Sequence, residues 1–77
     1  MSADPVLLDA KGLICPLPVL KARKALKAIP AGGRLRVLAT DEGALKDFEA
    51  FCRTTGHRLV ARNEPEDGVF EFLIEKA

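Results

Sequence analysis

The chain has 77 residues, and its 12 basic and 11 acidic side chains give a net charge of +1, which by itself predicts no polyanionic partner. Hydrophobic residues make up 48% of the chain, enough for a folded core, and two cysteines are too few for a fold that depends on disulfides. No apolar run is long enough to cross a membrane, and the first residues do not resemble a secretory leader. We therefore expect a single domain over residues 1–77 in a reducing compartment, most simply the cytoplasm.

The first part of the chain predicts a strand followed by a helix. The apolar run Val6–Leu8 indicates a short buried strand. From Cys15 onward the apolar residues recur at helical spacing, and Pro30 followed by two glycines ends the helix. The residues expected on the buried side of this helix are Val19, Ala22, Leu26 and Ile29.

A second strand and a second helix follow. Residues Arg34–Thr40 alternate between polar and apolar side chains, as in a strand with one buried face. Asp41, or alternatively Thr40, is the expected N-cap of the next helix, and Gly56 stands where a left-handed glycine ends a helix. The buried face of the strand is expected to hold Leu35, Val37 and Ala39, and that of the helix Leu45, Phe48, Phe51 and Cys52.

Two strands close the chain. They are expected over Arg58–Arg62 and Val69–Ile74, joined by a turn at Glu64–Gly68 that contains a proline and an Asp-Gly pair. The order β-α-β-α-β-β predicts an α/β domain of the α+β two-layer type. Right-handed crossovers place both helices on one face of a mixed four-stranded sheet.

The stretch LICPLP places a cysteine directly before two prolines. Prolines lose nothing in the first turn of a helix, where the N–H groups have no partner within the helix, so we expect Cys15 at the N-cap, Pro16 at N1 and Pro18 at N3. Gly12 supplies a flexible or left-handed position just before them. The positive end of the helix is expected to favour the thiolate form of Cys15.

A single sulfur at this position limits the chemistry. A thioredoxin-type centre needs a second cysteine three residues later, where this chain has Pro18. One rigidly presented sulfur is suited to attacking a sulfur donor and carrying the product as a persulfide. The residues alone leave open that Cys15 merely caps the helix, and a thiol-disulfide enzyme would need a bond between Cys15 and Cys52.

The stretch Leu8–Leu26, LDAKGLICPLPVLKARKAL, resembles the TusA/SirA family of small sulfurtransferases. The resemblance is carried by an Asp-x-x-Gly-x-x-Cys-Pro-x-Pro core and continues through Thr40–His57, so that it covers nearly the whole chain. The core residues are Asp9, Gly12, Cys15, Pro16 and Pro18. The family has the β-α-β-α-β-β two-layer fold, so the resemblance and the pattern of elements agree.

The resemblance implies a TusA-like sulfur-carrier domain and a sulfurtransferase that acts as a persulfide carrier. Cys15 would be the catalytic residue and would accept sulfane sulfur from a cysteine desulfurase or a similar donor. It would pass the sulfur to an acceptor, such as a DsrE-type relay protein in tRNA thiolation, or to sulfur-oxidation or molybdenum-cofactor pathways. Gly12, Pro16 and Pro18 are expected to shape the site.

The remaining sulfur and imidazole groups predict no second centre. Cys52 lies on the apolar stripe of the second helix and is expected to pack in the core, with a resolving role as the alternative. His57 is expected to begin the third strand, at the edge of the sheet far from Cys15. One histidine and two distant cysteines are too few for a zinc site, so we expect no metal and no cofactor.

Charge is distributed unevenly along the chain. Residues 1–40 carry seven basic and two acidic side chains, a balance of +5, whereas residues 41–77 carry five and nine, a balance of −4. Asp41, Glu42 and the turn at 64–68 should lie at the same edge as Cys15, where their charge would raise its pKa. Basic residues on the first helix are usually only a solvated face, but beside the sulfur they are our choice for partner docking. They are Lys21, Arg23, Lys24 and Lys27.

An alternative from another class is a non-catalytic nucleic-acid-binding or regulatory module that uses the basic first helix. The chain has no Trp and no Tyr, and no aromatic motif of the RNA-binding type, which weakens this alternative. We expect no direct nucleic-acid contact and no membrane contact. A carrier has to pass between partners, so we expect a monomer.

Overall fold

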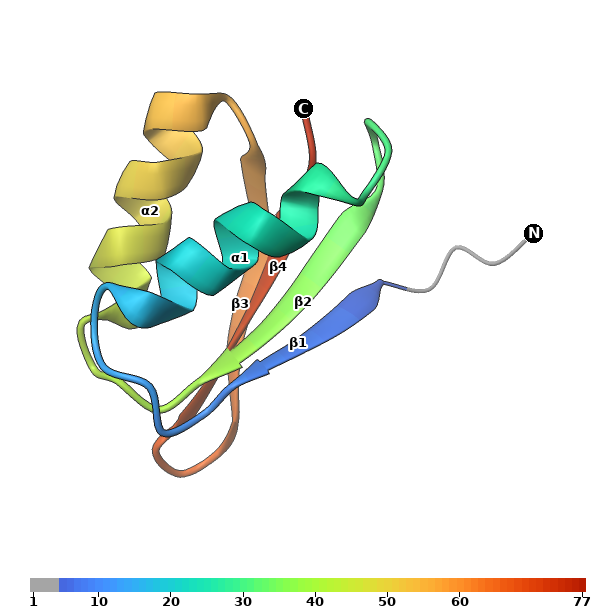
Figure 1. The fold of residues 1–77 in the computed structure, drawn as a ribbon. Helices are drawn as coiled ribbons and strands as arrows, with labels where there is room; N and C mark the ends of the chain where they lie inside the picture. Colours follow the sequence, from blue (N-terminus) through green and yellow to red (C-terminus); the bar gives the residue numbers. More distant parts are fainter. Residues whose placement is uncertain (1–4) are drawn as a thin grey trace.

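The computed structural model of the protein describes residues 5–77, so residues 1–4 of the expected domain lie outside the described part. Within that part, two helices and four strands follow one another in the predicted order (Figure 1). Their bounds are β1 Val6–Ala10, α1 Leu17–Lys27, β2 Arg34–Ala39, α2 Ala44–Thr55, β3 Arg58–Glu66 and β4 Val69–Glu75. The predicted fold class, an α+β two-layer sandwich, is confirmed.

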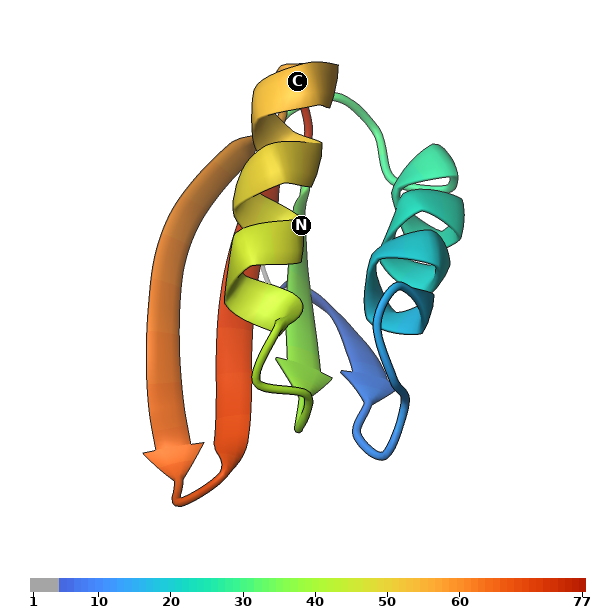
Figure 2. The same ribbon diagram turned by 90° about the vertical axis from the view of Figure 1, so that its left-hand side faces the viewer.

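The four strands form one mixed sheet in the order β1-β2-β4-β3. β1 pairs in parallel with β2, while β4 runs antiparallel between β2 and β3. Figures 1 and 2 show both helices on the same face of the sheet. Both helices connect strands that run in the same direction, and right-handed crossovers put them on one face. Among residues 5–77, neither helix is long and apolar enough to cross a bilayer.

The core lies between the sheet and the helices, where alternation along the strands directs the apolar side chains. The side chains of β2 that were predicted to be buried are fully buried, and the register places apolar residues of β4 beside them. They are Leu35, Val37 and Ala39 of β2, with Phe72 and Ile74 of β4. On the opposite face Arg34 forms an ion pair with Glu75, with 3.3 Å between Nε and Oε2.

Two aromatic rings join the second helix to the sheet. Phe48 at the middle of α2 is 0% exposed and Phe72 of β4 is 2% exposed. Their ring centroids lie 4.9 Å apart, with 33° between the ring planes. A buried aromatic pair contributes more stability than the burial of its surface area alone. This contact therefore holds α2 over the sheet.

Both helices begin later than the sequence predicted. The first residue of α1 is Leu17, and Pro16 occupies the N-cap, so Cys15 lies one residue outside the cap and Pro18 takes N2. The N-cap of α2 is Gly43, two residues after Asp41. The predicted end of α2 is confirmed, because Gly56 has a left-handed φ of 84° and its N–H bonds to the carbonyl of Cys52.

The last hairpin also differs from the prediction. β3 continues to Glu66, which leaves only Asp67 and Gly68 as the turn instead of the whole stretch from Glu64. Pro65 is tolerated inside β3 because β3 is an edge strand, and its pairing with β4 is irregular between Asn63 and Glu66.

The parallel pairing of β1 and β2 determines where the site lies. Because the two strands are parallel, their carboxyl ends meet at one edge of the sheet. The loop of residues 11–16 after β1 and the loop of residues 40–43 after β2 therefore lie side by side, next to the starts of both helices (Figure 1). Cys15 belongs to the first of these loops.

Candidate functional site

Two neighbouring loops hold Cys15 by hydrogen bonds between them. The backbone N–H of Gly12 donates to Thr40 Oγ1 at 2.9 Å, and the N–H of Cys15 donates to Asp41 Oδ2 at 2.6 Å. The second carboxylate oxygen of Asp41 accepts the N–H of Gly43 at 3.2 Å. Asp41 was predicted to be a helix N-cap, but Gly43 has that position and Asp41 instead links the two loops.

The Cys15 side chain is exposed and has one side-chain partner. Its thiol donates a hydrogen bond to the carboxylate of Asp47, which stands in the first turn of α2. This hydrogen bond is the main reason why the pKa of the Cys15 thiol is raised above its ordinary value. Reduced hydration of the thiol and the negative charges of Asp47 and Asp41 also raise this pKa.

The expectation that the start of α1 would favour a thiolate is therefore wrong for the unloaded protein. Cys15 lies outside the N-cap, and Pro16 and Pro18 remove two N–H groups from this end of the helix. The helix end is consequently a weaker influence than the nearby carboxylates. The prediction that acidic groups at this edge raise the pKa of Cys15 is confirmed for Asp41, whereas the larger effect of Asp47 was not predicted.

The residues expected to shape the site have distinct positions. Gly12 has a φ of +83°, a left-handed conformation that side-chain-bearing residues rarely adopt. Pro18 is buried, whereas Pro16 is exposed and joins the loop to α1. The N–H of Leu17 donates to the carbonyl of Ile14 at 2.9 Å, which closes the turn that contains Cys15.

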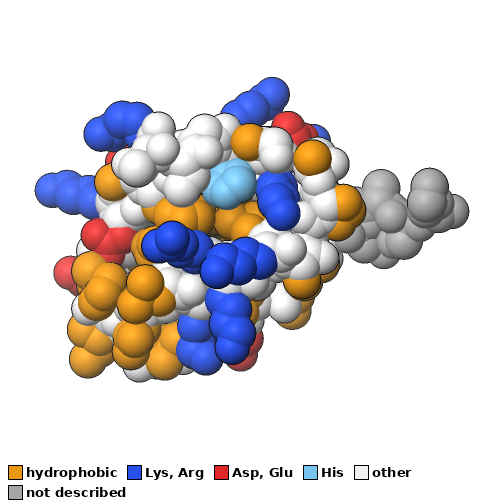
Figure 3. Space-filling view, turned by 45° about the horizontal axis from the view of Figure 1, so that its top comes forward, with side chains coloured by type: hydrophobic (Ala, Val, Ile, Leu, Met, Phe, Trp, Pro, Cys, Tyr) orange, Lys and Arg blue, Asp and Glu red, His pale blue; other side chains and the backbone are white. Residues whose placement is uncertain are grey.

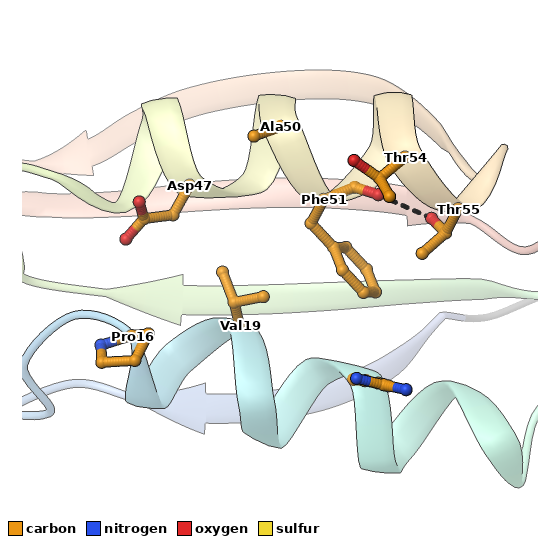
Figure 4. A pocket seen from close by; sticks show the side chains of 8 residues that line it. Pro16, Val19, Asp47, Ala50, Phe51, Thr54 and Thr55 are labelled. Carbon is orange, nitrogen blue, oxygen red and sulfur yellow. Dashed lines mark hydrogen bonds between the residues drawn. The ribbon is translucent and has the colours of Figure 1, made fainter.

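A groove of about 450 Å³ runs between the two helices and starts beside the thiol. Figure 4 shows Pro16 and Val19 of the α1 side opposite Asp47 and Phe51 of α2. Arg23 lines the same groove. The groove therefore connects the carboxylate that contacts Cys15 with one residue of the predicted docking face.

The predicted docking face is exposed on α1. All four of its side chains are solvent-accessible, and Figure 3 shows Lys and Arg side chains around the single histidine, beside an apolar area. Lys24 and Lys27 stand in the last turn of the helix, where positive charge is favourable. The four residues are Lys21, Arg23, Lys24 and Lys27.

An exposed apolar rim near the thiol, formed by Ile14, Leu17 and Leu20, was not predicted from the sequence. Ile14 is 73% exposed, Leu20 50% and Leu17 44%. Ile14 directly precedes Cys15, and Leu17 and Leu20 follow it by two and five residues. Leu17 and Leu20 do not belong to the apolar stripe predicted for the buried side of α1. This position in the sequence pattern could have identified them as exposed. Large apolar side chains left in water next to one reactive group are typical of an interaction site.

The other candidate groups lie away from the thiol. Cys52 is 6% exposed in the core, and burial raises the pKa of its thiol. His57 precedes β3 by one residue, and its Nδ1 accepts the N–H of Ala77 at 3.0 Å. Glu42 lines a separate hollow of about 330 Å³ with residues of β3 and β4. In the described chain, residues 5–77, no group of three His, Cys, Asp or Glu side chains is placed to hold a metal.

The fold and this edge together define a small α+β protein that presents one exposed thiol at the meeting point of two loops. Residues 6–76 match the family model described as Sulfurtransferase TusA. The chain belongs to the TusA sulfurtransferase family, and the resemblance found in the sequence is confirmed.

Individual relatives support this assignment. The chain is 53% identical over 70 residues to the sulfur carrier protein TusA of Allochromatium vinosum, with 91% of each chain covered. It is 45% identical over 69 residues to TusA of Pseudomonas syringae, covering 90% of this chain and 81% of the relative. The crystal structure of a SirA-like protein from Desulfitobacterium hafniense superposes with a TM-score of 0.81 at 31% identity, covering 91% of this chain and 95% of that one. The activity of this family is sulfur transfer, in which a carrier takes sulfur from a donor and passes it to an acceptor protein.

Proposed function

We propose that the protein carries one sulfane sulfur atom as a persulfide on Cys15. The donor is a cysteine desulfurase or a similar source of sulfane sulfur, and the acceptor is a relay protein of the DsrE type. The observation that supports this proposal is a single exposed thiol, held by two loops, in a chain of the TusA family. The other cysteine is buried and unsuited to exchange with another protein.

The reaction needs no oxidant, because the sulfur is transferred between two thiols. The Cys15 thiol first loses its proton to water, and the thiolate attacks the outer sulfur of the donor persulfide. A new S–S bond forms as the S–S bond of the donor breaks, and the inner sulfur of the donor leaves as a thiolate. A thiolate of the acceptor then attacks the outer sulfur on Cys15 in the same way and releases the Cys15 thiolate.

The residues around Cys15 serve presentation in this proposal. Gly12 and Pro16 hold the turn on either side of the thiol, and the buried Pro18 fixes the first turn of α1 in the core. A loop fixed in this way keeps the sulfur accessible to two partners in succession. Cys52 is buried on α2 whereas Cys15 is exposed, and this disfavours an internal disulfide that would end the transfer.

Partner docking is proposed for the exposed side of α1. Leu20 lies one turn from both Arg23 and Lys24, so apolar and basic side chains alternate on this surface. A partner with acidic side chains around an apolar contact is complementary to it. The exposed side of α1 begins at Leu17, two residues after Cys15, so a docked partner has its reactive sulfur near the thiol.

Loading tests the proposed function directly. The reduced protein is incubated with a cysteine desulfurase and cysteine, and its intact mass is measured. We expect a gain of one sulfur atom, located on the Cys15 peptide and removed by dithiothreitol. If neither the desulfurase nor thiosulfate or polysulfide loads the protein, the proposed function is overturned. A salt-dependent shift with RNA or DNA would then favour the nucleic-acid-binding alternative.

Charge reversal on α1 tests the docking face. The double variant Lys24→Glu/Lys27→Glu is expected to load from the desulfurase at least about tenfold more slowly at low salt, because acidic partner groups are repelled. Loading from polysulfide, which needs no docking, should stay unchanged. Arg53→Glu, a single charge reversal on an exposed position of α2 outside the groove, is the control for charge reversal elsewhere on the protein. Equal rates for all three proteins with the desulfurase would contradict the docking proposal.

A further inference from the structure

Asp47 reaches the sulfur of Cys15 from a different element of the fold. It stands in the first turn of α2, and its side chain points into the groove between the helices (Figure 4). Its Oδ2 accepts the hydrogen bond of the Cys15 thiol. The other acidic group near Cys15 is Asp41, which accepts a hydrogen bond from the backbone N–H of Cys15 and does not bind the sulfur.

The charge of Asp47 is not neutralised by a salt bridge. Among residues 5–77 the ion pairs involve Asp9, Glu71 and Glu75, and none involves Asp47. Arg23 lines the same groove but forms no ion pair with it. The contact between Asp47 and the thiol is thus a negative acceptor facing a neutral donor, and it depends on the proton that lies between them.

We propose that Asp47 is a latch that holds the empty carrier and releases the loaded one. In the empty protein the carboxylate accepts the thiol proton and holds the sulfur against α2. In the loaded protein the sulfur of Cys15 is bonded to an outer sulfur and has no proton to donate. This inference rests on the proposed persulfide function, and it assigns Asp47 as a positioning residue for that reaction.

Ionisation of the outer sulfur explains why the loaded sulfur moves away from Asp47. A persulfide is a stronger acid than the thiol from which it forms, so its outer sulfur is negatively charged near neutral pH. Two negative groups at contact distance repel each other, and Asp41 adds repulsion from the neighbouring loop. The outer sulfur therefore turns away from α2 toward solvent, where an acceptor approaches.

The empty thiol is protected by the same contact. The carboxylate raises the pKa of Cys15 and so reduces the fraction of reactive thiolate. Oxidation of cysteine follows thiolate character and exposure, and this thiol is exposed. A carrier that waits for its donor is less exposed to oxidation when its sulfur keeps the proton.

Alkylation kinetics test the empty state. In a Cys52→Ser background, Cys15 is the single thiol, and its rate with iodoacetamide is measured from pH 5 to 10. In Asp47→Asn we expect the profile to move to lower pH and the rate at pH 7 to rise at least about threefold, since the gain in thiolate outweighs its lower nucleophilicity. Glu49→Gln, exposed on the same helix, removes the same charge without touching the sulfur and should keep the original profile.

The loaded state is tested with the same variants after loading with polysulfide. Alkylation of the outer sulfur should differ by less than about twofold between the Asp47→Asn protein and its parent, because the ionised outer sulfur already lies turned away from α2 and no thiol proton remains to be held. An Asp47→Asn profile that matches the parent in the empty state overturns the latch. So does an outer sulfur that changes with Asp47→Asn as strongly as the thiol does.

Failure of the latch and failure of the proposed function give different results. The alkylation of the empty thiol needs no sulfur donor and reports on Asp47 even if the protein never loads. If the protein loads normally but Asp47→Asn has no effect on the thiol, only the latch is wrong. If no donor loads the protein, the persulfide function is wrong, and the latch as stated falls with it.

Discussion

Replacing Cys15 with serine is expected to abolish sulfur loading and to leave the fold intact. A serine hydroxyl keeps its proton near neutral pH and is a weak nucleophile without an activating base, so no stable adduct with the donor sulfur forms. Cys15 is exposed, and its contact with Asp41 uses the backbone N–H, which serine retains. The expected result is no gain in intact mass, with a thermal unfolding midpoint close to that of the wild type.

Cys52→Ser is the matched control for this experiment. It should load to the same extent as the wild type, since Cys52 is buried and does not face a partner. It places a hydroxyl in the core, so we expect its free energy of unfolding to fall by about 1–3 kcal/mol. A Cys15→Ser protein that still gains sulfur would contradict the assignment of Cys15, and loss of loading in a folded Cys52→Ser protein would show that the second thiol takes part.

The fold could be predicted because its elements are specified by local patterns. Leu35, Val37 and Ala39 alternate along β2 with exposed arginines, and all three proved fully buried. Gly56 ended α2 as expected, since a left-handed φ at that point favours glycine. The ends of elements were less predictable. Pro65 indicated a turn, but pairing of the edge strand with β4 carried β3 past it.

The site could be predicted only in part, because its chemistry depends on contacts between distant segments. Cys15 and its prolines form a local motif, and the motif was sufficient to locate the thiol. Asp47 is 32 residues away in the chain, and no local pattern connects it with Cys15. Its position could have been inferred from topology, since the parallel strands bring the starts of both helices to the same edge. The direction of its side chain, and hence its hydrogen bond to the thiol, required the structure.

Phe48→Ala is expected to have the largest effect on stability. Phe48 is fully buried and packs on Phe72, so truncation removes both the buried ring and the aromatic contact. Phenylalanine-to-alanine changes in a core cost about 3–5 kcal/mol, whereas a chain of this size has roughly 4–12 kcal/mol in total. The midpoint of thermal unfolding should fall by at least about 12 °C, as measured by circular dichroism with urea unfolding as a second measurement.

Phe51→Ala provides the comparison, because the same ring is removed from the groove side of the same helix. Phe51 is only partly buried and lines the groove between α1 and α2, so the loss should be about 1–2 kcal/mol. Equal losses for the two variants would contradict the assignment of Phe48 as the contact that fixes α2. That contact matters for the site as well, since α2 carries Asp47 to the sulfur. The folded fraction of Phe48→Ala should therefore show faster alkylation of Cys15, whereas Phe51→Ala should keep the wild-type rate.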